Sequence, residues 1–422
     1  MLITFKVSNF LSFSEEQSLS MIPSIFDNND LIKIENIKLL RKGVIFGANS
    51  SGKSNFIKAI AFGKELVIEG FSNKHRNKYS KIASGNKDRE SNFEYTFYSN
   101  GKFYSYGFSF VLSEGKFTGE YLYEIDYNDN EKLLFSRTEN EFVWKFETKE
   151  KQKKIEELLQ EQPNRLLINI SALSLGFESL FNVYQWFLNK VIVSFQNQEF
   201  MRLESGLMKS RSQFEKFLRN YDTGICKILF RKLDLENLKK HGEEIYQRII
   251  KEMKRSTTSF GIRLKDALYN FDCVNGEFEV YEVFLRHQSS ELDYEFGEES
   301  DGTRRMFDLM DIIISPIPNA IYLIDEINRS IHPLLTEKYL LSFKNCLKEN
   351  NVQLLFTTHE ANLLREDLLR RDEVWFVEKQ TDNSSKIFSL DIFQKENEKD
   401  LGKAYLAGRY GGIPLLYKSG DE

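Results

Sequence analysis

One short stretch restricts what this chain can fold into more than any other, the eight residues GANSSGKS from Gly47 to Ser54. They fit G-x-x-x-x-G-K-[S/T], a loop whose backbone N–H groups surround a phosphate. The apolar run 44–46 predicts a buried strand before the loop, and residues 55–60 predict an amphipathic helix after it. Strand, glycine-rich loop and helix are the setting that this motif requires. The sequence therefore predicts a nucleotide site here.

The residue types in this loop predict individual roles. Lys53 is expected to reach the β- and γ-phosphates, and Ser54 is expected to ligate Mg²⁺. The helix that follows would point its positive end at the phosphates. The predicted nucleotide-binding residues are Gly47, Ala48, Asn49, Ser50, Ser51, Gly52, Lys53, Ser54 and Asn55.

A second set of motif residues lies in the last third of the chain. The apolar run 320–324 predicts a strand that ends in Asp325-Glu326. An Asp in this position can hold the Mg²⁺ shell, and the Glu beside it can polarise an attacking water as general base. The next apolar strand, 352–358, ends at His359, which would sense the γ-phosphate. We predict Asp325 on the metal side, with Glu326 and His359 as catalytic residues.

This order of motifs resembles the ATPase head of the ATP-binding-cassette (ABC) class. ESDGTRR, which precedes the acidic strand, resembles a variant of the signature motif of that class, although it departs from the common leucine-serine-glycine-glycine form. The resemblance implies ATP and Mg²⁺ as ligands, with the signature of one subunit closing over the γ-phosphate held by another. Ser300, Asp301, Gly302 and Thr303 would act in this way, in a homodimer or higher homo-oligomer. For the glutamine lid residue of the class, Gln196 and Gln198 are only candidates.

The resemblance narrows with further motifs. NFLSF near the start, ahead of the phosphate loop, looks like the SMC, RecF and OLD-type heads. The further motifs are EESDGTRR, LIDEINRSIHP, FTTHE and the tail KAYLAGRYGGIP. Together they resemble the bacterial AAA15-type ATPases, which include the RloA, AbiL and AriA-like proteins of anti-phage defence. The resemblance implies a sensor or scaffold subunit in abortive infection. A separate effector such as a TOPRIM-type nuclease and a phage-derived trigger would then be its partners.

Two other functions remain open at this point. A DNA-repair or DNA-end-binding ATPase of the RecF or SMC kind would bind DNA in an ATP-dependent, salt-sensitive manner. A scaffold with ATP as a purely structural ligand would not need Glu326 or His359.

The predicted fold is α/β, a P-loop NTPase of the ABC-ATPase head type with a mixed central sheet. Alternation of period two from residue 92 to residue 126, with an Asn100-Gly101 turn, predicts an antiparallel β-subdomain. Residues 164–260 are predicted to be mostly helical. We expect an N-terminal ATPase lobe at 1–148, a mainly helical insertion at 149–270, and a C-terminal ATPase lobe at 271–422.

Composition narrows the class of partner and the compartment. The net charge of -5 argues against a broadly basic nucleic-acid surface, although it leaves room for a local basic groove. The three cysteines have no zinc spacing. No signal peptide and no run of 18 apolar residues are visible, so we expect a cytoplasmic protein without a membrane segment.

Overall fold

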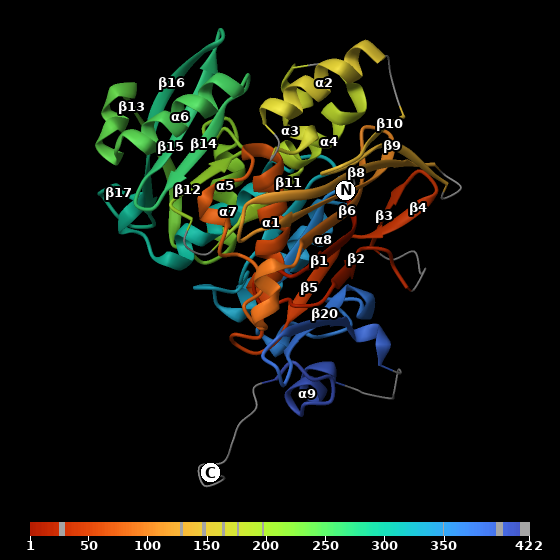
Figure 1. Ribbon diagram of the computed structural model, residues 1–422. Helices are drawn as coiled ribbons and strands as arrows, with labels where there is room; N and C mark the ends of the chain where they lie inside the picture. Colours follow the sequence, from red (N-terminus) through yellow and green to blue (C-terminus); the bar gives the residue numbers. More distant parts are fainter. Residues whose placement is uncertain are drawn as a thin grey trace. The chain divides into compact units, whose positions relative to one another are not determined.

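The computed structural model describes residues 1–24, 30–126, 130–145, 149–162, 165–174, 177–195, 198–348, 350–393 and 400–413 (Figure 1). The chain forms two compact units, each assembled from separated segments. Unit 1 comprises Met1–Val193, Pro318–Ile327 and Asn350–Glu422. Unit 2 comprises Ser194–Ile317 and Asn328–Glu349. The predicted segments 1–148, 149–270 and 271–422 are contiguous in sequence and therefore do not coincide with these units.

The six-stranded sheet of unit 1 has the order β11-β18-β19-β5-β20-β21. Its strands are β5 (Lys42–Phe46), β11 (Val191–Ser194), β18 (Ile321–Ile324), β19 (Gln353–Thr357), β20 (Val374–Lys379) and β21 (Ser385–Ser389). Strands β18, β19, β5 and β20 pair in parallel, and β21 is antiparallel to β20. Both faces of such a sheet are covered, which explains why β5, β18 and β19 are buried at every residue. The predicted parallel strands are confirmed.

The second sheet of unit 1 is an antiparallel meander in the order β10-β9-β8-β7-β6-β1-β2. Its strands are β1 (Leu2–Ser8), β2 (Gln17–Ser20), β6 (Ser91–Ser99), β7 (Lys102–Val111), β8 (Lys116–Ile125), β9 (Glu131–Thr138) and β10 (Phe142–Trp144). A separate hairpin joins β3 (Leu31–Ile34) to β4 (Ile37–Leu40). The predicted antiparallel subdomain is confirmed, with the turn at Asn100-Gly101 in the positive-φ conformation that its sequence favours.

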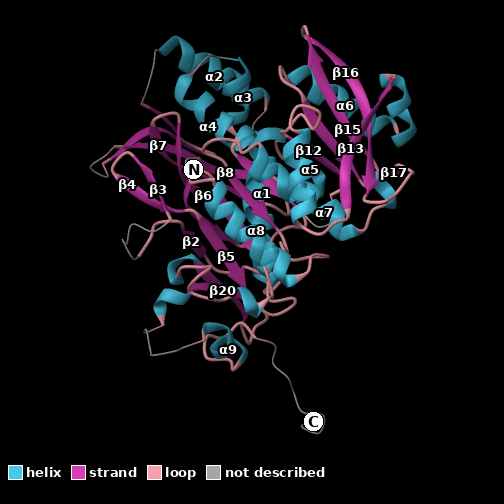
Figure 2. Cartoon of the chain, turned by 180° about the vertical axis from the view of Figure 1, so that it is seen from behind, coloured by secondary structure: helices cyan, strands magenta, loops and turns pink. Residues whose placement is uncertain are grey.

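The helices of unit 1 lie in three parts of the sequence. They are α1 (Lys53–Glu69), α2 (Lys149–Glu161), α3 (Leu167–Ser174), α4 (Glu178–Asn189) and α9 (Leu401–Leu406). Figure 2 shows α2, α3 and α4 as one group, and α1 contacts both α3 and α4. In the core, Trp186 of α4 stacks on Phe97 of β6 with ring centroids 4.1 Å apart. The aromatic alternation of the meander therefore packs a sheet face.

Unit 2 is built on a sheet in the order β12-β14-β15-β16-β13, with β17 paired to β16. Its strands are β12 (Phe200–Leu203), β13 (Ile225–Leu233), β14 (Phe260–Leu264), β15 (Leu268–Val274), β16 (Glu277–His287) and β17 (Tyr294–Glu295). Its helices are α5 (Arg211–Asn220), α6 (Glu243–Arg255), α7 (Asp301–Ile314) and α8 (Pro333–Cys346). Tyr246 and Ile249 of α6 share an apolar core with Phe260 and Ile262 of β14.

The prediction that residues 164–260 are mostly helical is wrong in unit 2. Strand β13 pairs with β16 from Ile225↔His287 to Leu233↔Val280, and β12 pairs with β14. The run ICKILFRKL carries no clean period, and its pairing with a partner more than 40 residues later decides its conformation. None of the helices in the described part of the chain is long and apolar enough to span a bilayer.

Candidate nucleotide site

The predicted phosphate-binding loop lies between β5 and α1 in unit 1. Ser50 has a φ of 62° and Gly52 a φ of 108°, both in the left-handed region. A Cβ at Gly52 would clash with Ser385 Oγ and lie 2.7 Å from Ser12 Oγ. Position 52 therefore requires glycine both for its backbone conformation and for the close approach of these two serines. The loop ends at Lys53, where α1 begins.

The side chain of Lys53 is buried and folds back over the loop. Its Nζ donates hydrogen bonds to Gly47 O at 2.7 Å and to Ala48 O at 2.8 Å. Burial lowers the pKa of Lys53, and the negative charges of Glu326 and Asp325 act in the opposite direction. The predicted catalytic carboxylate and the predicted metal carboxylate therefore both lie within electrostatic reach of this ammonium group.

Three hydrogen bonds hold one side of the loop, two made by side chains and one between backbone groups. Asn55 Nδ2 donates to Ser12 Oγ at 2.9 Å, Ser385 Oγ donates to Ser51 O at 2.6 Å, and Ser385 N donates to Ser12 O at 2.7 Å. Ser51 and Ser385 are 334 positions apart in the sequence, so a distant part of the chain fixes one side of the loop. The sequence prediction missed Ser12 and Ser385. Ser12 lies within the NFLSF motif, whereas Ser385 carried no signal.

The acidic pair follows β18. Asp325 is buried and accepts a hydrogen bond from Thr357 Oγ1 at 2.7 Å. The backbone N–H of Glu326 donates to the same Thr357 Oγ1 at 2.7 Å, and Glu326 has a φ of 47°. A non-glycine residue in this conformation carries strain that the surrounding contacts must offset. Thr357, which the sequence prediction also missed, therefore holds the Asp325 carboxylate and the Glu326 backbone.

The sheet register brings the three predicted elements together at one edge. Phe356 of β19 pairs with Ile324 of β18 on one side and with Val44 of β5 on the other. The loop after β5, the pair Asp325-Glu326 after β18 and His359 after β19 thus follow the carboxyl ends of neighbouring parallel strands. Ligands of open α/β sheets bind at this edge. His359 is exposed there, and Thr358 N donates to Ile45 O at 3.1 Å.

The C-terminal motif also reaches this loop. A Cβ at Gly412 would lie 3.7 Å from Gly47 Cα. Tyr405 OH donates to Gly412 O at 3.0 Å, and the Tyr405 ring packs on Phe46 with centroids 5.9 Å apart. The described part of KAYLAGRYGGIP therefore packs behind the phosphate loop.

The four predicted signature residues lie in unit 2, at the start of α7. Ser300 caps the helix, since its Oγ accepts from Thr303 N at 3.1 Å and contacts Thr303 Oγ1 at 2.9 Å. The helix begins at Asp301, because this cap closes its first turn. A Cβ at Gly302 would clash with the backbone oxygen of Ser330, which accounts for glycine at that position.

Gln196 and Gln198 were the candidates for the glutamine lid residue. Gln196 lies outside the described residues. Gln198 belongs to unit 2, where its backbone oxygen accepts from Arg263 Nη1 at 2.9 Å and its Oε1 accepts from Phe195 N at 3.4 Å. Neither contact involves a residue of the phosphate loop.

The residues of the loop fit the predicted ligands. Ser51 Oγ is buried and has no hydrogen-bond partner among the described residues, so the loop holds a polar atom that a ligand could satisfy. The Ser54 hydroxyl and the Asp325 carboxylate are the hard oxygen donors that Mg²⁺ prefers.

Comparison with known families matches residues 44–365 to the family described as "AAA domain, putative AbiEii toxin, Type IV TA system". This chain belongs to that family. The match runs from within β5 to beyond His359. It includes the phosphate loop, the predicted signature, the acidic pair and His359, whereas NFLSF and the C-terminal tail lie outside it. The predicted α/β fold of a P-loop NTPase is confirmed.

Two solved structures are similar to this AAA domain protein. One is described as the "SmcHead bound to the C-winged helix domain of ScpA", with 13% identity and a TM-score of 0.41, covering 94% of this chain and 98% of that chain. The other is an SMC head domain from Thermotoga maritima, with 14% identity and a TM-score of 0.34, covering 92% and 98%. No curated protein matches the sequence.

Proposed function

We propose that this AAA domain protein binds and hydrolyses ATP. The observation that supports this most directly is the arrangement of Lys53, Asp325 and Glu326 at one edge of the parallel sheet. The ammonium group of Lys53 lies within the electrostatic field of both carboxylates. A phosphate held by the loop would occupy the place where the positive charge, the metal-side carboxylate and the base are all required.

Each side chain has a defined task in this proposal. Lys53 exchanges its hydrogen bonds to Gly47 O and Ala48 O for phosphate oxygens. Glu326 accepts a proton from the attacking water, and Thr357 holds its backbone in place. His359 donates to the γ-phosphate. Ser54 and Asp325 would hold Mg²⁺, which neutralises phosphate charge when it is bound.

The proposal extends to an assembly. In the ABC class that this chain resembles, the signature of one subunit completes the site of another, and Ser300, Asp301, Gly302 and Thr303 would do so here. Hydrolysis would then require a homodimer. The AAA15 resemblance supports a sensor or scaffold subunit of an anti-phage complex, with a separate nuclease-like effector and a phage-derived trigger.

Two substitutions test the enzymatic part. Lys53→Ala should abolish ATP binding, because the loop loses the charge that faces the phosphates. Glu326→Gln should retain ATP binding and lose at least about a hundredfold in turnover, the usual contribution of a general base. Equilibrium ATP binding and phosphate release from purified protein measure both. Wild-type turnover by Glu326→Gln would falsify the base assignment.

A further inference from the structure

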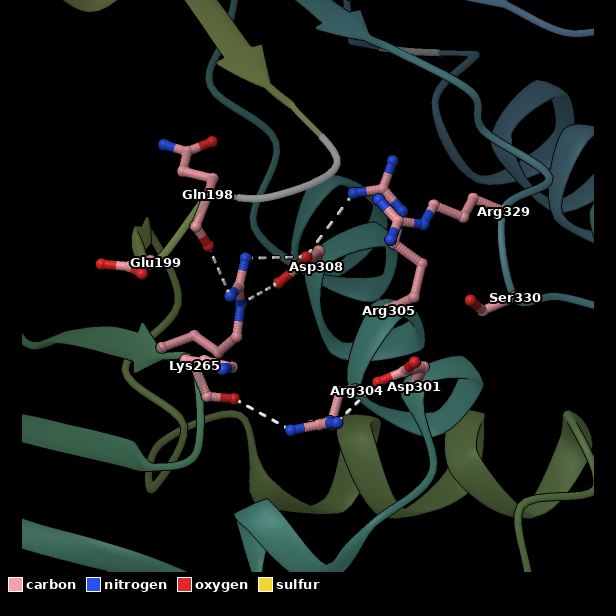
Figure 3. Close-up of a pocket in the computed structure, with 10 residues that line it drawn as sticks. Gln198, Glu199, Lys265, Asp301, Arg304, Arg305, Asp308, Arg329 and Ser330 are labelled. Atoms are coloured by element: carbon pink, nitrogen blue, oxygen red, sulfur yellow. Dashed lines mark hydrogen bonds and ion pairs between the residues drawn. The ribbon is translucent and has the colours of Figure 1, made fainter.

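Unit 2 contains a cavity with a strongly charged lining. It has a volume of about 400 Å³ and lies beside the N-terminal half of α7. Figure 3 shows Lys265, Arg304, Arg305, Arg329 and Asp308 among the residues that line this cavity. The volume is within the range of small-ligand sites.

The positive charges of the lining outnumber the negative ones. The cations are Arg263, Lys265, Arg304, Arg305 and Arg329, and the anions are Glu199, Asp301 and Asp308. The cavity thus carries a formal excess of two positive charges in a chain whose net charge is -5. Such a local reversal of sign favours an anionic ligand.

Two arginines share one buried carboxylate in the lining of this cavity. Arg263 binds Asp308 through both oxygens, with Nε–Oδ1 at 2.8 Å and Nη2–Oδ2 at 3.1 Å. Arg305 Nη1 lies 3.6 Å from the same Oδ2 and donates to Ser194 Oγ at 2.9 Å. Asp308 is 5% exposed and Arg305 is 10% exposed, so these charges are largely removed from water.

A buried cation that shares its counter-ion is incompletely neutralised, so binding of a further anion lowers its free energy. Burial lowers the pKa of Arg305, the Asp308 carboxylate opposes this effect, and the neighbouring Arg263 lowers the pKa further. Guanidinium groups present planar, fork-shaped sets of N–H donors that match phosphate oxygens. The exposed cations of the cavity lining, here called the rim, are Lys265 and Arg329. These two side chains add positive charge to the lining.

From this geometry we infer that the cavity binds a small oligophosphate anion, such as pyrophosphate or the phosphate tail of a free nucleotide. The site shares no lining residue with the phosphate loop of unit 1. The inference concerns binding of the anion in this cavity and includes no hydrolysis of ATP at that place. The same oligophosphate chemistry could come from a nucleotide held on the phosphate loop of a second copy, and the experiment separates these two sources.

The test uses the full chain carrying Lys53→Ala, which removes binding by the phosphate loop. Inorganic pyrophosphate is titrated at low salt by calorimetry. We expect one saturable site in this variant. Adding Lys265→Gln and Arg329→Gln should weaken binding at least about tenfold, since two charge-assisted contacts are lost. Lys251→Gln is the matched control, because it removes an exposed charge of α6 in the same unit.

A second measurement, thermal unfolding, distinguishes loss of binding from loss of stability when the buried Arg305 is substituted. Pyrophosphate should raise the unfolding midpoint of the Lys53→Ala chain, and Arg305→Gln should remove this shift even if it lowers the starting midpoint. Binding seen only with an intact Lys53 would overturn the inference and assign the anion to a phosphate loop. Binding unaffected by the rim substitutions, or binding of duplex DNA without binding of pyrophosphate, would overturn it as well.

Discussion

At the scale of single residues, Thr357 connects the two halves of the proposed chemistry. One hydroxyl donates to Asp325 and accepts from the backbone of Glu326, which has a left-handed conformation. The sequence could not reveal this role. Threonine at the end of a buried strand is ordinary, and its two contacts span about 30 residues. Asp325 and Glu326 were predicted as site residues because they end an apolar strand that follows a phosphate loop in the chain.

Thr357→Val keeps the shape of the side chain and removes the hydroxyl. We expect a loss of about 1–3 kcal/mol in the free energy of unfolding, because Asp325 and the Glu326 N–H lose a buried partner. Turnover should fall at least about tenfold with a small change in ATP affinity, since the carboxylates lose their alignment. Urea unfolding and steady-state hydrolysis measure the two effects. Thr357→Ser should restore most of both, and equal defects in the two variants would contradict the role of the hydroxyl.

At the scale of elements, α7 combines a structural cap with a predicted signature. Ser300 Oγ already accepts from Thr303 N, so its hydroxyl has a local task. The predicted role in trans is a second task for the same atom. Substitutions that keep one task and remove the other can separate them.

Ser300→Ala should lower the free energy of unfolding by about 1 kcal/mol, because the cap is lost. Ser300→Asp should keep the cap, since Asp is a strong N-cap residue, and it places a negative charge where the γ-phosphate is expected. If Ser300 faces that phosphate, Ser300→Asp abolishes hydrolysis in a stable protein. Normal hydrolysis by Ser300→Asp would remove Ser300 from the signature role. Thermal unfolding and turnover are the measurements.

A second element-level feature links α1 to the short helix η1 (Asn73–His75). Glu65 of α1 contacts His75 Nε2 at 3.3 Å and also pairs with Lys74. The adjacent His75 imidazole, followed by the Lys74 ammonium group, lowers the pKa of Glu65 to about 2. A carboxyl whose folded pKa is lowered adds stability above its unfolded value of 4.5 and loses it as the pH falls toward 2.

Glu65→Gln should therefore destabilise the protein at pH 7, and the difference from wild type should shrink as the pH falls below about 4.5. Urea unfolding at a series of pH values gives this difference directly. Glu69→Gln is the control, because Glu69 is on the same helix, is 60% exposed and lies 3.7 Å from Lys74. A difference that grows on acidification would contradict the assigned direction of the shift.

The elements themselves were largely predictable where a pattern is local. The phosphate loop, the strands at 321–324 and 353–357, and the meander from 91 to 125 follow from apolar runs and alternation. Strand β13 was not predictable, because pairing with β16 decides its state and its own residues lack a clear period. Ser12 and Ser385 were missed for a related reason, since their hydrogen bonds join the two ends of the chain.

At the scale of the whole molecule, the phosphate loop belongs to unit 1 and the signature residues belong to unit 2. The sequence predicted this order of motifs and could not predict the division, because each unit takes segments from more than one region. A site completed in trans would make assembly depend on nucleotide.

Glu326→Gln with ATP should therefore show a native mass of at least a dimer, and Lys53→Ala should not respond to ATP. Native mass measurement of the tagged chain, expressed from its own operon, checks this and identifies co-purifying proteins. A stoichiometric nuclease-like partner would support the proposed role in an anti-phage complex. Recovery with DNA alone, in a salt-sensitive manner, would favour the alternative function of a DNA-repair or DNA-end-binding ATPase. A monomer under all conditions would contradict completion in trans.

The sheet register also has a consequence for how the protein is made. Val44 of β5 pairs with Phe356 on one side and Val374 on the other. At a synthesis rate of about 5–20 residues per second, β5 leaves the ribosome roughly 15–60 s before either neighbour exists. The nascent chain must keep this apolar strand from other partners during that time. Truncated products that end before residue 350 should accordingly depend on chaperones and aggregate without them.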